Sequence, residues 1–214
     1  MDEIIEQIGR LRLVPMVVLD DAAHADGFGD ALVAGGLPVA EVTFRTDAAE
    51  AAIRRLAKRG DLLVGAGTVL SREQADRAID AGAAFLVAPG TNPEVIDHCL
   101  LRSVPIVPGV ATPSEIEEAM SFGLTALKFF PAENLGGVAM LKALAGPYAN
   151  VQFLPTGGIT PEKLPEYLRL PYVLACGGSW LAPRDALAKG DFATIRKLIE
   201  QAVKILASVP AAAN

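Results

Sequence analysis

Short apolar segments alternate with helical segments along the whole chain, and this alternation restricts the possible folds more than any other feature. The apolar segments contain four to six residues and are rich in Val, Leu, Ile and Phe, as buried strands usually are. Their starts recur roughly every 20 to 26 residues, the size of one strand-helix unit in a compact barrel. We expect strands over Val14–Leu19, Val39–Thr43, Leu62–Gly65, Phe85–Ala88, Pro105–Pro108, Ala126–Phe130, Gln152–Pro155 and Tyr172–Ala175.

Helix-capping residues support the alternation. Thr112-Pro113-Ser114-Glu115 combines an N-cap hydroxyl, a proline at the first helical position and the glutamate of a capping box. Ser71-Arg72-Glu73-Gln74 repeats the capping box. An acidic amphipathic helix is also expected over about Asp2 to Gly9. Three glycines follow helical segments and fit left-handed helix ends: Gly60, Gly82 and Gly123.

Eight strand-helix units in 214 residues predict an α/β fold, namely a single-domain (β/α)8 TIM barrel with a short N-terminal helix. No linker or low-complexity tract divides the chain, so we expect one domain over residues 1–214. An open doubly wound sheet is the main alternative. In a barrel of this kind, the functional residues lie at the C-terminal ends of the strands.

Composition and charge argue against several classes of protein. A hydrophobic content of 51% with 21% charged residues is typical of a compact globular protein. The apolar runs are too short to cross a bilayer, and the start of the chain is acidic where a secretory signal would be basic. A net charge of -6 and a pI near 5.0 argue against nucleic acid or an anionic membrane as the main partner. We expect a cytoplasmic protein in which Cys99 and Cys176 are buried thiols.

A lysine, Lys128, lies in the middle of the apolar strand expected over Ala126–Phe130. A charged lysine is almost never fully buried without a partner, because its ammonium group loses hydration. Burial favours the neutral amine, which is the form that a Schiff-base nucleophile requires. The structural alternative is a lysine that reaches a sheet edge or pairs with a carboxylate.

The second expected strand carries an unusual polar face. Side chains alternate along a strand, so Glu41, Thr43 and Arg45 share one face, while Val42 and Phe44 share the other. The apolar pair suits the helix layer, which leaves the polar face pointing into the mouth of the barrel. Alternatively, Glu41 and Arg45 form a salt bridge that only fills the barrel.

Glycine-rich turns follow several strands. Gly65-Ala66-Gly67-Thr68 and Ala88-Pro89-Gly90 contain small residues that let a ligand approach the backbone. Thr156-Gly157-Gly158 and Gly177-Gly178-Ser179 follow the last two strands and are expected to expose backbone N–H groups at helix starts. These two loops form the recurrent phosphate site of this fold, although flexible turns without a ligand are the alternative.

Several other chemistries lack the residues that they need. His24 and His98 are the two histidines, and neither falls at the C-terminal end of an expected strand, which argues against a histidine-based zinc site or a Ser-His-Asp triad. Gly65-Ala66-Gly67 lacks the continuation of a dinucleotide fingerprint, so no cofactor is expected. A buried amine, a facing carboxylate, an arginine and a phosphate pocket suit carbonyl chemistry on a phosphorylated acid.

Five segments together resemble the 2-keto-3-deoxy-6-phosphogluconate (KDPG) and 4-hydroxy-2-oxoglutarate (KHG) aldolase family. The resemblance runs in order from about Val14 to about Asp191, nearly the whole chain. It implies a metal-independent class I aldolase on a (β/α)8 barrel, commonly a homotrimer, acting in the Entner-Doudoroff pathway of carbohydrate metabolism. The segments are Glu41-Val42-Thr43-Phe44-Arg45-Thr46, Gly65-Ala66-Gly67-Thr68-Val69-Leu70, Lys128-Phe129-Phe130-Pro131-Ala132-Glu133, Pro155-Thr156-Gly157-Gly158-Ile159 and Gly177-Gly178-Ser179-Trp180.

The resemblance also implies a role for individual residues. Lys128 would be the Schiff-base lysine and Glu41 the general acid/base. The carboxylate and carbonyl of the substrate would be surrounded by Arg45, Thr68 and Thr156, with Pro89 and Phe130 shaping the pocket. The phosphate would be held by Gly157, Gly158, Gly178 and Ser179. The implied reaction is cleavage of KDPG to pyruvate and glyceraldehyde 3-phosphate.

The sequence departs from the family pattern in places, and related substrates stay open. Phe44 stands where leucine is usual, and Ala88 replaces a common serine, so a hydroxyl contact is missing there. KHG, the phosphogalactonate epimer of KDPG and decarboxylation of oxaloacetate are alternatives that use the same imine. The residues after Lys128, Phe-Phe-Pro-Ala-Glu, resemble the phosphogluconate branch of the family more than the phosphogalactonate branch. A non-catalytic phosphosugar-binding barrel is the alternative from another class.

Overall fold

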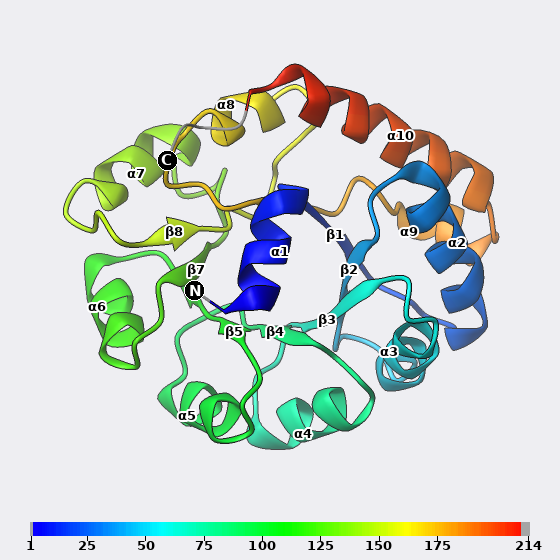
Figure 1. Ribbon diagram of the computed structural model, residues 1–214, viewed down its shortest axis with the longest axis horizontal. Coiled ribbons are helices and arrows are strands. Elements are labelled where there is room, and N and C mark those ends of the chain that lie inside the picture. Colours follow the sequence, from blue (N-terminus) through cyan, green and yellow to red (C-terminus); the bar gives the residue numbers. More distant parts are fainter. Residues whose placement is uncertain (1, 211–214) are drawn as a thin grey trace.

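A ring of parallel strands surrounded by helices forms the molecule, and the computed structural model describes residues 2–210. In Figure 1 the helices α2 to α10 lie around the strands, and α1 (Glu3–Leu11) lies across the centre of the ring. Every pair of neighbouring strands is parallel. This arrangement confirms the expected α/β barrel with its short N-terminal helix and excludes the open doubly wound sheet.

The ring consists of two sheets. The six-stranded sheet has the order β5-β4-β3-β2-β1-β9, and the three-stranded sheet has the order β6-β7-β8. The fifth expected strand, Pro105–Pro108, corresponds to β5, and β6 follows it after Pro108. Isolated bridges from Phe153 to Val173 and from Thr156 to Gly177 close the ring on the other side. The strands are β1 Leu13–Val17, β2 Val39–Thr43, β3 Leu63–Gly67, β4 Phe85–Val87, β5 Ile106–Val107, β6 Gly109–Val110, β7 Ala126–Phe129, β8 Gln152–Phe153 and β9 Cys176–Gly178.

The last strand is not where the sequence predicts it. We expected a strand over Tyr172–Ala175, but β9 is Cys176–Gly178, and Val173 makes only a single bridge. Glycine is a poor strand former, which hid this strand. Here the absent side chain is required, because a Cβ on Gly177 would overlap Thr156, with the Cγ2 atom 2.9 Å away.

Helices connect the strands and begin and end at the expected capping residues. Thr112 forms the complete capping box with Glu115, and the Ser71 hydroxyl accepts a hydrogen bond from the Gln74 N–H. The glycines after α3, α4 and α6 all have positive φ. The remaining helices are η1 Ala22–His24, α2 Ala25–Gly35, α3 Ala49–Lys58, α4 Arg72–Asp80, α5 Pro93–Leu101, α6 Pro113–Ser121, α7 Gly137–Ala145, α8 Leu164–Leu168, α9 Arg184–Ala188 and α10 Phe192–Ser208.

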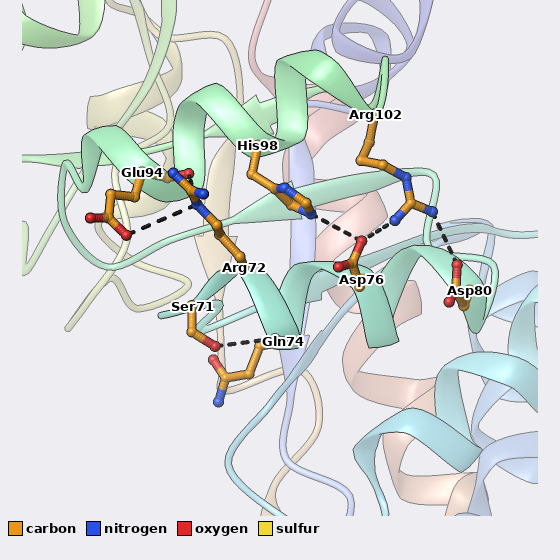
Figure 2. Close-up of polar contacts among 8 residues, drawn as sticks. All are labelled: Ser71, Arg72, Gln74, Asp76, Asp80, Glu94, His98 and Arg102. Atoms are coloured by element: carbon orange, nitrogen blue, oxygen red, sulfur yellow. Dashed lines mark hydrogen bonds and ion pairs between the residues drawn. The ribbon is translucent and has the colours of Figure 1, made fainter.

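Apolar side chains fill the space between strands and helices in one continuous core that includes Val42, Leu86 and Phe129. Polar contacts join neighbouring helices outside this core. Figure 2 shows Asp76 of α4 between His98 and Arg102 at α5, with Asp76 Oδ1 3.0 Å from His98 Nε2. Within residues 2–210, no helix is both long and apolar enough to span a membrane.

Candidate active site

Lys128 and Glu41 meet inside the barrel, although they lie on different sheets. Lys128 is on β7 and Glu41 on β2, and the Lys128 Nζ atom is 3.4 Å from Glu41 Oε1. Lys128 is 3% exposed and Glu41 0%. Glu41 Oε2 is also buried and has no hydrogen-bond partner among residues 2–210. The contact with Lys128 therefore satisfies one of the two carboxylate oxygens.

Gly67 provides the space for the Glu41 carboxylate. A Cβ on Gly67 would overlap Glu41 Oε1 and would lie 2.7 Å from Glu41 Cδ. Gly65, two residues earlier on β3, makes room for the Phe85 ring in the same way. We expected these glycines to let a ligand approach the backbone. In the structure, protein side chains occupy the space that they leave.

Arg45 does not form the ion pair with Glu41 that the sequence suggested. Its side chain is exposed, and its Nε donates to Thr43 Oγ1 at 3.3 Å. The Thr43 hydroxyl in turn donates to Val17 O at 3.0 Å. The alternative in which an Arg45–Glu41 salt bridge fills the barrel is wrong for the described residues 2–210, because the carboxylate pairs with Lys128. The guanidinium thus stays accessible to a ligand.

The expected pocket residues lie at or just after the ends of four strands, β3, β4, β7 and β8. The Lys128 Nζ atom lies 5.3 Å from the centre of the Phe130 ring, within the range of contacts between a lysine and an aromatic face. Thr156 is 1% exposed and follows β8. Thr68 at the end of β3 and Pro89 after β4 are half-buried, and Thr68 has a φ of 59°. A non-glycine residue in this region is strained, and such strain clusters at functional sites.

The two glycine loops lie at the C-terminal ends of β8 and β9, as expected, but not at helix starts. Gly157 and Gly158 have φ values of 104° and 78°, and α8 begins only at Leu164. Gly178 is the buried last residue of β9, Ser179 is exposed, and α9 begins at Arg184. An anion bound here would contact loop N–H groups and the Ser179 hydroxyl rather than a helix N-terminus.

Both histidines lie on helices, and both cysteines are buried. His24 belongs to η1 and His98 to α5, while Cys99 and Cys176 are buried free thiols. Burial raises the pKa of Cys99 to about 11 and raises that of Cys176 as well, so both stay protonated at neutral pH. In the described part of the chain, no three His, Cys, Asp or Glu side chains are grouped as metal ligands.

A buried lysine amine facing a buried carboxylate, at the C-terminal ends of parallel barrel strands, defines an enzyme suited to imine chemistry on a carbonyl substrate. Comparison with known proteins identifies the family. The family model "Aldolase: KDPG and KHG aldolase" matches residues 4–198. The chain belongs to this family, and the resemblance of the five segments is confirmed.

Relatives and solved structures agree with this membership over nearly the whole chain. The chain is 49% identical over 207 residues to 2-dehydro-3-deoxy-phosphogluconate aldolase of Treponema pallidum, covering 96% of this chain and 99% of the relative. It is 46% identical over 193 residues to KHG/KDPG aldolase of Escherichia coli K12, covering 90% and 91%. KDPG aldolase from Legionella pneumophila, solved with pyruvate captured as a covalent carbinolamine, superimposes with a TM-score of 0.88 at 37% identity, covering 92% and 96%.

The sequence placed Lys128 and Glu41 in one site but did not predict their direct contact. The two residues are 87 positions apart, and strand periodicity does not specify which faces meet across a closed ring. Sequence reasoning missed one further residue. Glu133 follows Lys128 and contacts the Gly157–Gly158 loop, Lys163 and Tyr167. Its position directly after Pro131-Ala132 within a matched segment was the available signal.

Proposed function

We propose that this chain is a class I aldolase that cleaves KDPG to pyruvate and glyceraldehyde 3-phosphate, with residues 1–214 forming one catalytic domain. The observation that carries the proposal is the buried contact of 3.4 Å between Lys128 Nζ and Glu41 Oε1. The Treponema relative is named for the same substrate, and the Legionella relative holds pyruvate as a carbinolamine.

Imine formation follows from this pair. An amine attacks a ketone only in its neutral form, and transfer of one proton from Lys128 to Glu41 supplies that form without changing the total charge. Lys128 then attacks C2 of the substrate to give a carbinolamine. Glu41 returns the proton to the departing hydroxyl group, so water leaves and a protonated imine and a carboxylate remain.

Carbon-carbon cleavage uses the same carboxylate. The protonated imine accepts the electron pair of the C3–C4 bond, while Glu41 removes the proton of the C4 hydroxyl, directly or through a water molecule. Glu41 Oε2, which has no partner within residues 2–210, is the oxygen free to do this. Glyceraldehyde 3-phosphate leaves, Glu41 protonates the enamine at C3, and hydrolysis releases pyruvate.

The surrounding residues orient the substrate in this proposal. Arg45 offers its planar fork of donors to the carboxylate, and the Thr68 and Thr156 hydroxyls contact the carboxylate and carbonyl groups. Pro89 and Phe130 provide the apolar walls. At the far end of the substrate, the phosphate lies against Gly157, Gly158, Gly178 and Ser179, where binding energy can align the reacting atoms.

KHG is the second candidate substrate, because the Escherichia coli relative is named for both reactions. The phosphogalactonate epimer and oxaloacetate would react through the same imine. Relative cleavage rates on KDPG, its epimer and KHG distinguish these activities. A non-catalytic phosphosugar-binding barrel would cleave none of them, and it would have no use for the buried amine of Lys128.

We also propose a cytoplasmic homotrimer, as in the family that the sequence resembles. A chain with a TM-score of 0.82 and 25% identity occurs in a cube-shaped cage designed by fusing symmetric oligomeric domains. Light scattering of the purified protein tests the assembly, and a mass of one or two chains would contradict it.

Covalent trapping tests the proposed function directly. Incubation with pyruvate and borohydride should inactivate the protein and add one reduced pyruvate to the peptide that contains Lys128. The exposed Lys142 and Lys163 are internal controls in the same digest. A chelator should leave activity intact. Labelling of either control lysine in place of Lys128, or loss of activity with the chelator, would contradict the assignment.

A further inference from the structure

Glu133 connects the strand of Lys128 to the glycine loop that follows β8. The backbone N–H of Glu133 donates to Gly157 O at 3.0 Å, and that of Ala132 donates to Thr156 O at 2.8 Å. The segment that leaves β7 is thus bonded along the start of the loop. Any movement of this segment also moves the backbone groups of Gly157.

The side chain of Glu133 is held at both carboxylate oxygens. Tyr167 of α8, which is fully buried, donates its hydroxyl to Glu133 Oε1 at 2.6 Å, and Lys163 contacts Glu133 Oε2. Burial and the bond to Glu133 raise the pKa of Tyr167, so the phenol stays a donor. Burial opposes ionisation of Glu133, but the bonds from Lys163 and Tyr167 outweigh it and lower the pKa of Glu133. Tyr167 therefore stays a donor and Glu133 an acceptor at neutral pH.

The glycine loop also packs against the stem of Glu133. A Cβ on Gly158 would lie 2.7 Å from Glu133 Cβ and 3.0 Å from its Cγ. At the start of α7, a Cβ on Gly137 would lie 3.1 Å from Glu133 Oε1 and 3.2 Å from the Tyr167 hydroxyl oxygen. Close packing on two sides leaves the carboxylate little freedom, and it fixes the loop against this side chain.

We propose that Glu133 is a positioning residue that sets the place of the Gly157–Gly158 loop relative to Lys128. In this role Glu133 touches no substrate atom. Its contacts keep the Gly157–Gly158 loop at a fixed distance from Lys128. This distance fits the length of a substrate that forms an imine at one end and binds through a phosphate at the other. The inference rests on the proposed function, because it assumes that the phosphate binds at this loop.

Steady-state kinetics of Glu133→Ala and Tyr167→Phe test the role. Loss of a hydrogen bond to a charged group corresponds to about 10- to 100-fold in an equilibrium constant, so kcat/KM for KDPG should fall by about this factor in Glu133→Ala, mainly through KM. Tyr167→Phe should also lower kcat/KM for KDPG, by about tenfold or more and again mainly through KM. Cleavage of unphosphorylated KHG, and trapping of pyruvate by borohydride, should change less than about threefold in both variants.

Three further variants complete the series. Glu133→Gln keeps an oxygen that accepts from Tyr167 and should restore kcat/KM for KDPG to within about threefold of the original protein. Lys163→Met removes a largely exposed partner and should also cost less than about threefold. Lys142→Met, on an exposed position of α7, is the matched control and should change nothing.

Equal losses on KDPG and KHG in Glu133→Ala and Tyr167→Phe would overturn the inference, since a residue that only supports the fold affects both substrates. An unchanged KM for KDPG would overturn it too. Failure of the proposed function gives a different result, because the unsubstituted protein would then form no adduct with pyruvate. If Glu133→Ala does not fold, the difference between the losses on KDPG and on KHG in Tyr167→Phe decides the question.

Discussion

The two sheets of the barrel differ in their longest strand pair, although the six-stranded sheet pairs over only two or three residues outside β2 and β3. In the six-stranded sheet, β2 pairs with β3 over five consecutive residues, from Val39 with Leu63 to Thr43 with Gly67. In the three-stranded sheet, β6 pairs with β7 and β7 with β8 over two residues each. Glu41 therefore lies on a strand with a long pairing, β2, while Lys128 lies on β7, which pairs over short stretches. The Gly157–Gly158 loop follows β8, which also has a short pairing.

This difference separates two tasks within one site. In the proposed mechanism, the long-paired sheet holds the carboxylate that takes and returns protons. The short-paired sheet holds the proposed nucleophile and leads into the loop whose backbone groups are proposed to bind the phosphate. Because local stability follows pairing and burial, we expect the three-stranded half to open more easily than the β2–β3 pair. The following substitutions test this comparison.

The largest expected effect comes from Glu41→Gln in the long-paired sheet. The amide cannot take a proton from the C4 hydroxyl, and the loss of general acid/base catalysis typically costs about 10²- to 10⁴-fold in turnover. The variant should still form an adduct with pyruvate and borohydride, because Lys128 is retained. Measurement of kcat for KDPG together with mass spectrometry of the adduct checks both parts. A kcat close to that of the original protein would mean that Glu41 only pairs with Lys128.

The junction between the sheets should be sensitive to one added methyl group. Gly109 begins β6, its N–H donates to Gly90 O at 3.3 Å, and a Cβ there would overlap the carbonyl group of Pro89. Backbone atoms cannot move aside as side chains do, so Gly109→Ala should lower the free energy of unfolding by about 1 to 3 kcal/mol in urea.

Gly90→Ala is the matched control for this substitution. No atom lies within 4 Å of its added Cβ, so the change should stay within about 0.5 kcal/mol. Equal urea midpoints for the two variants would show that the junction tolerates strain and that the sheets are not tightly joined.

The comparison of sheets also explains what could be predicted from the sequence. The strand Val39–Thr43 was predicted with its observed bounds, and Lys128 and Glu41 were identified because charged residues within apolar strands are conspicuous. For β2, the apolar pattern and the strand coincide. For β9, which pairs with β1 in the same six-stranded sheet, they do not, because the glycines of Cys176–Gly178 carry no strand pattern.

Direct contacts between side chains on opposite strands could not be predicted, because they depend on how the strands close into a barrel. Periodicity placed Glu41 and Arg45 on one face, which favoured a pair between them, yet closure brings Lys128 to Glu41 from the opposite sheet. In the same way, Gly67 was expected to face a ligand but makes room for a carboxylate two residues from the end of the adjacent strand.

Thr68 tests whether the backbone is strained at the end of β3 in the six-stranded half. Thr68 directly follows β3 and has a φ of 59°. This left-handed conformation costs a non-glycine residue roughly 1 to 2 kcal/mol. Thr68→Gly and Thr68→Ala both remove the hydroxyl, so both should raise KM for KDPG similarly. Because glycine alone relieves the strain, Thr68→Gly should be more stable than Thr68→Ala by about 1 kcal/mol in urea unfolding. An alanine variant of equal stability would show that the backbone here is not strained.

The smallest effect is expected at Asp76, on the outside of the six-stranded half (Figure 2). The hydrogen bond from His98 and the charge of Arg102 outweigh burial and lower the pKa of Asp76 below its ordinary value of 3.8. The carboxylate contribution to stability is therefore present above pH 3.8 and disappears as the pH falls through the lower pKa of the folded protein. Asp76→Ala should lower the urea midpoint at neutral pH, and the difference from the original protein should shrink in acid.

Asp97→Ala, on an exposed position of α5, is the control for this last substitution, because no ion pair involves Asp97 within residues 2–210. It should leave the urea midpoint unchanged at every pH. Neither variant should change kcat for KDPG, since the α4–α5 contact lies on the helix ring and not at the strand ends. A fall in kcat for Asp76→Ala would mean that the six-stranded half transmits changes in its helices to Glu41, and the division of tasks between the two sheets would be wrong.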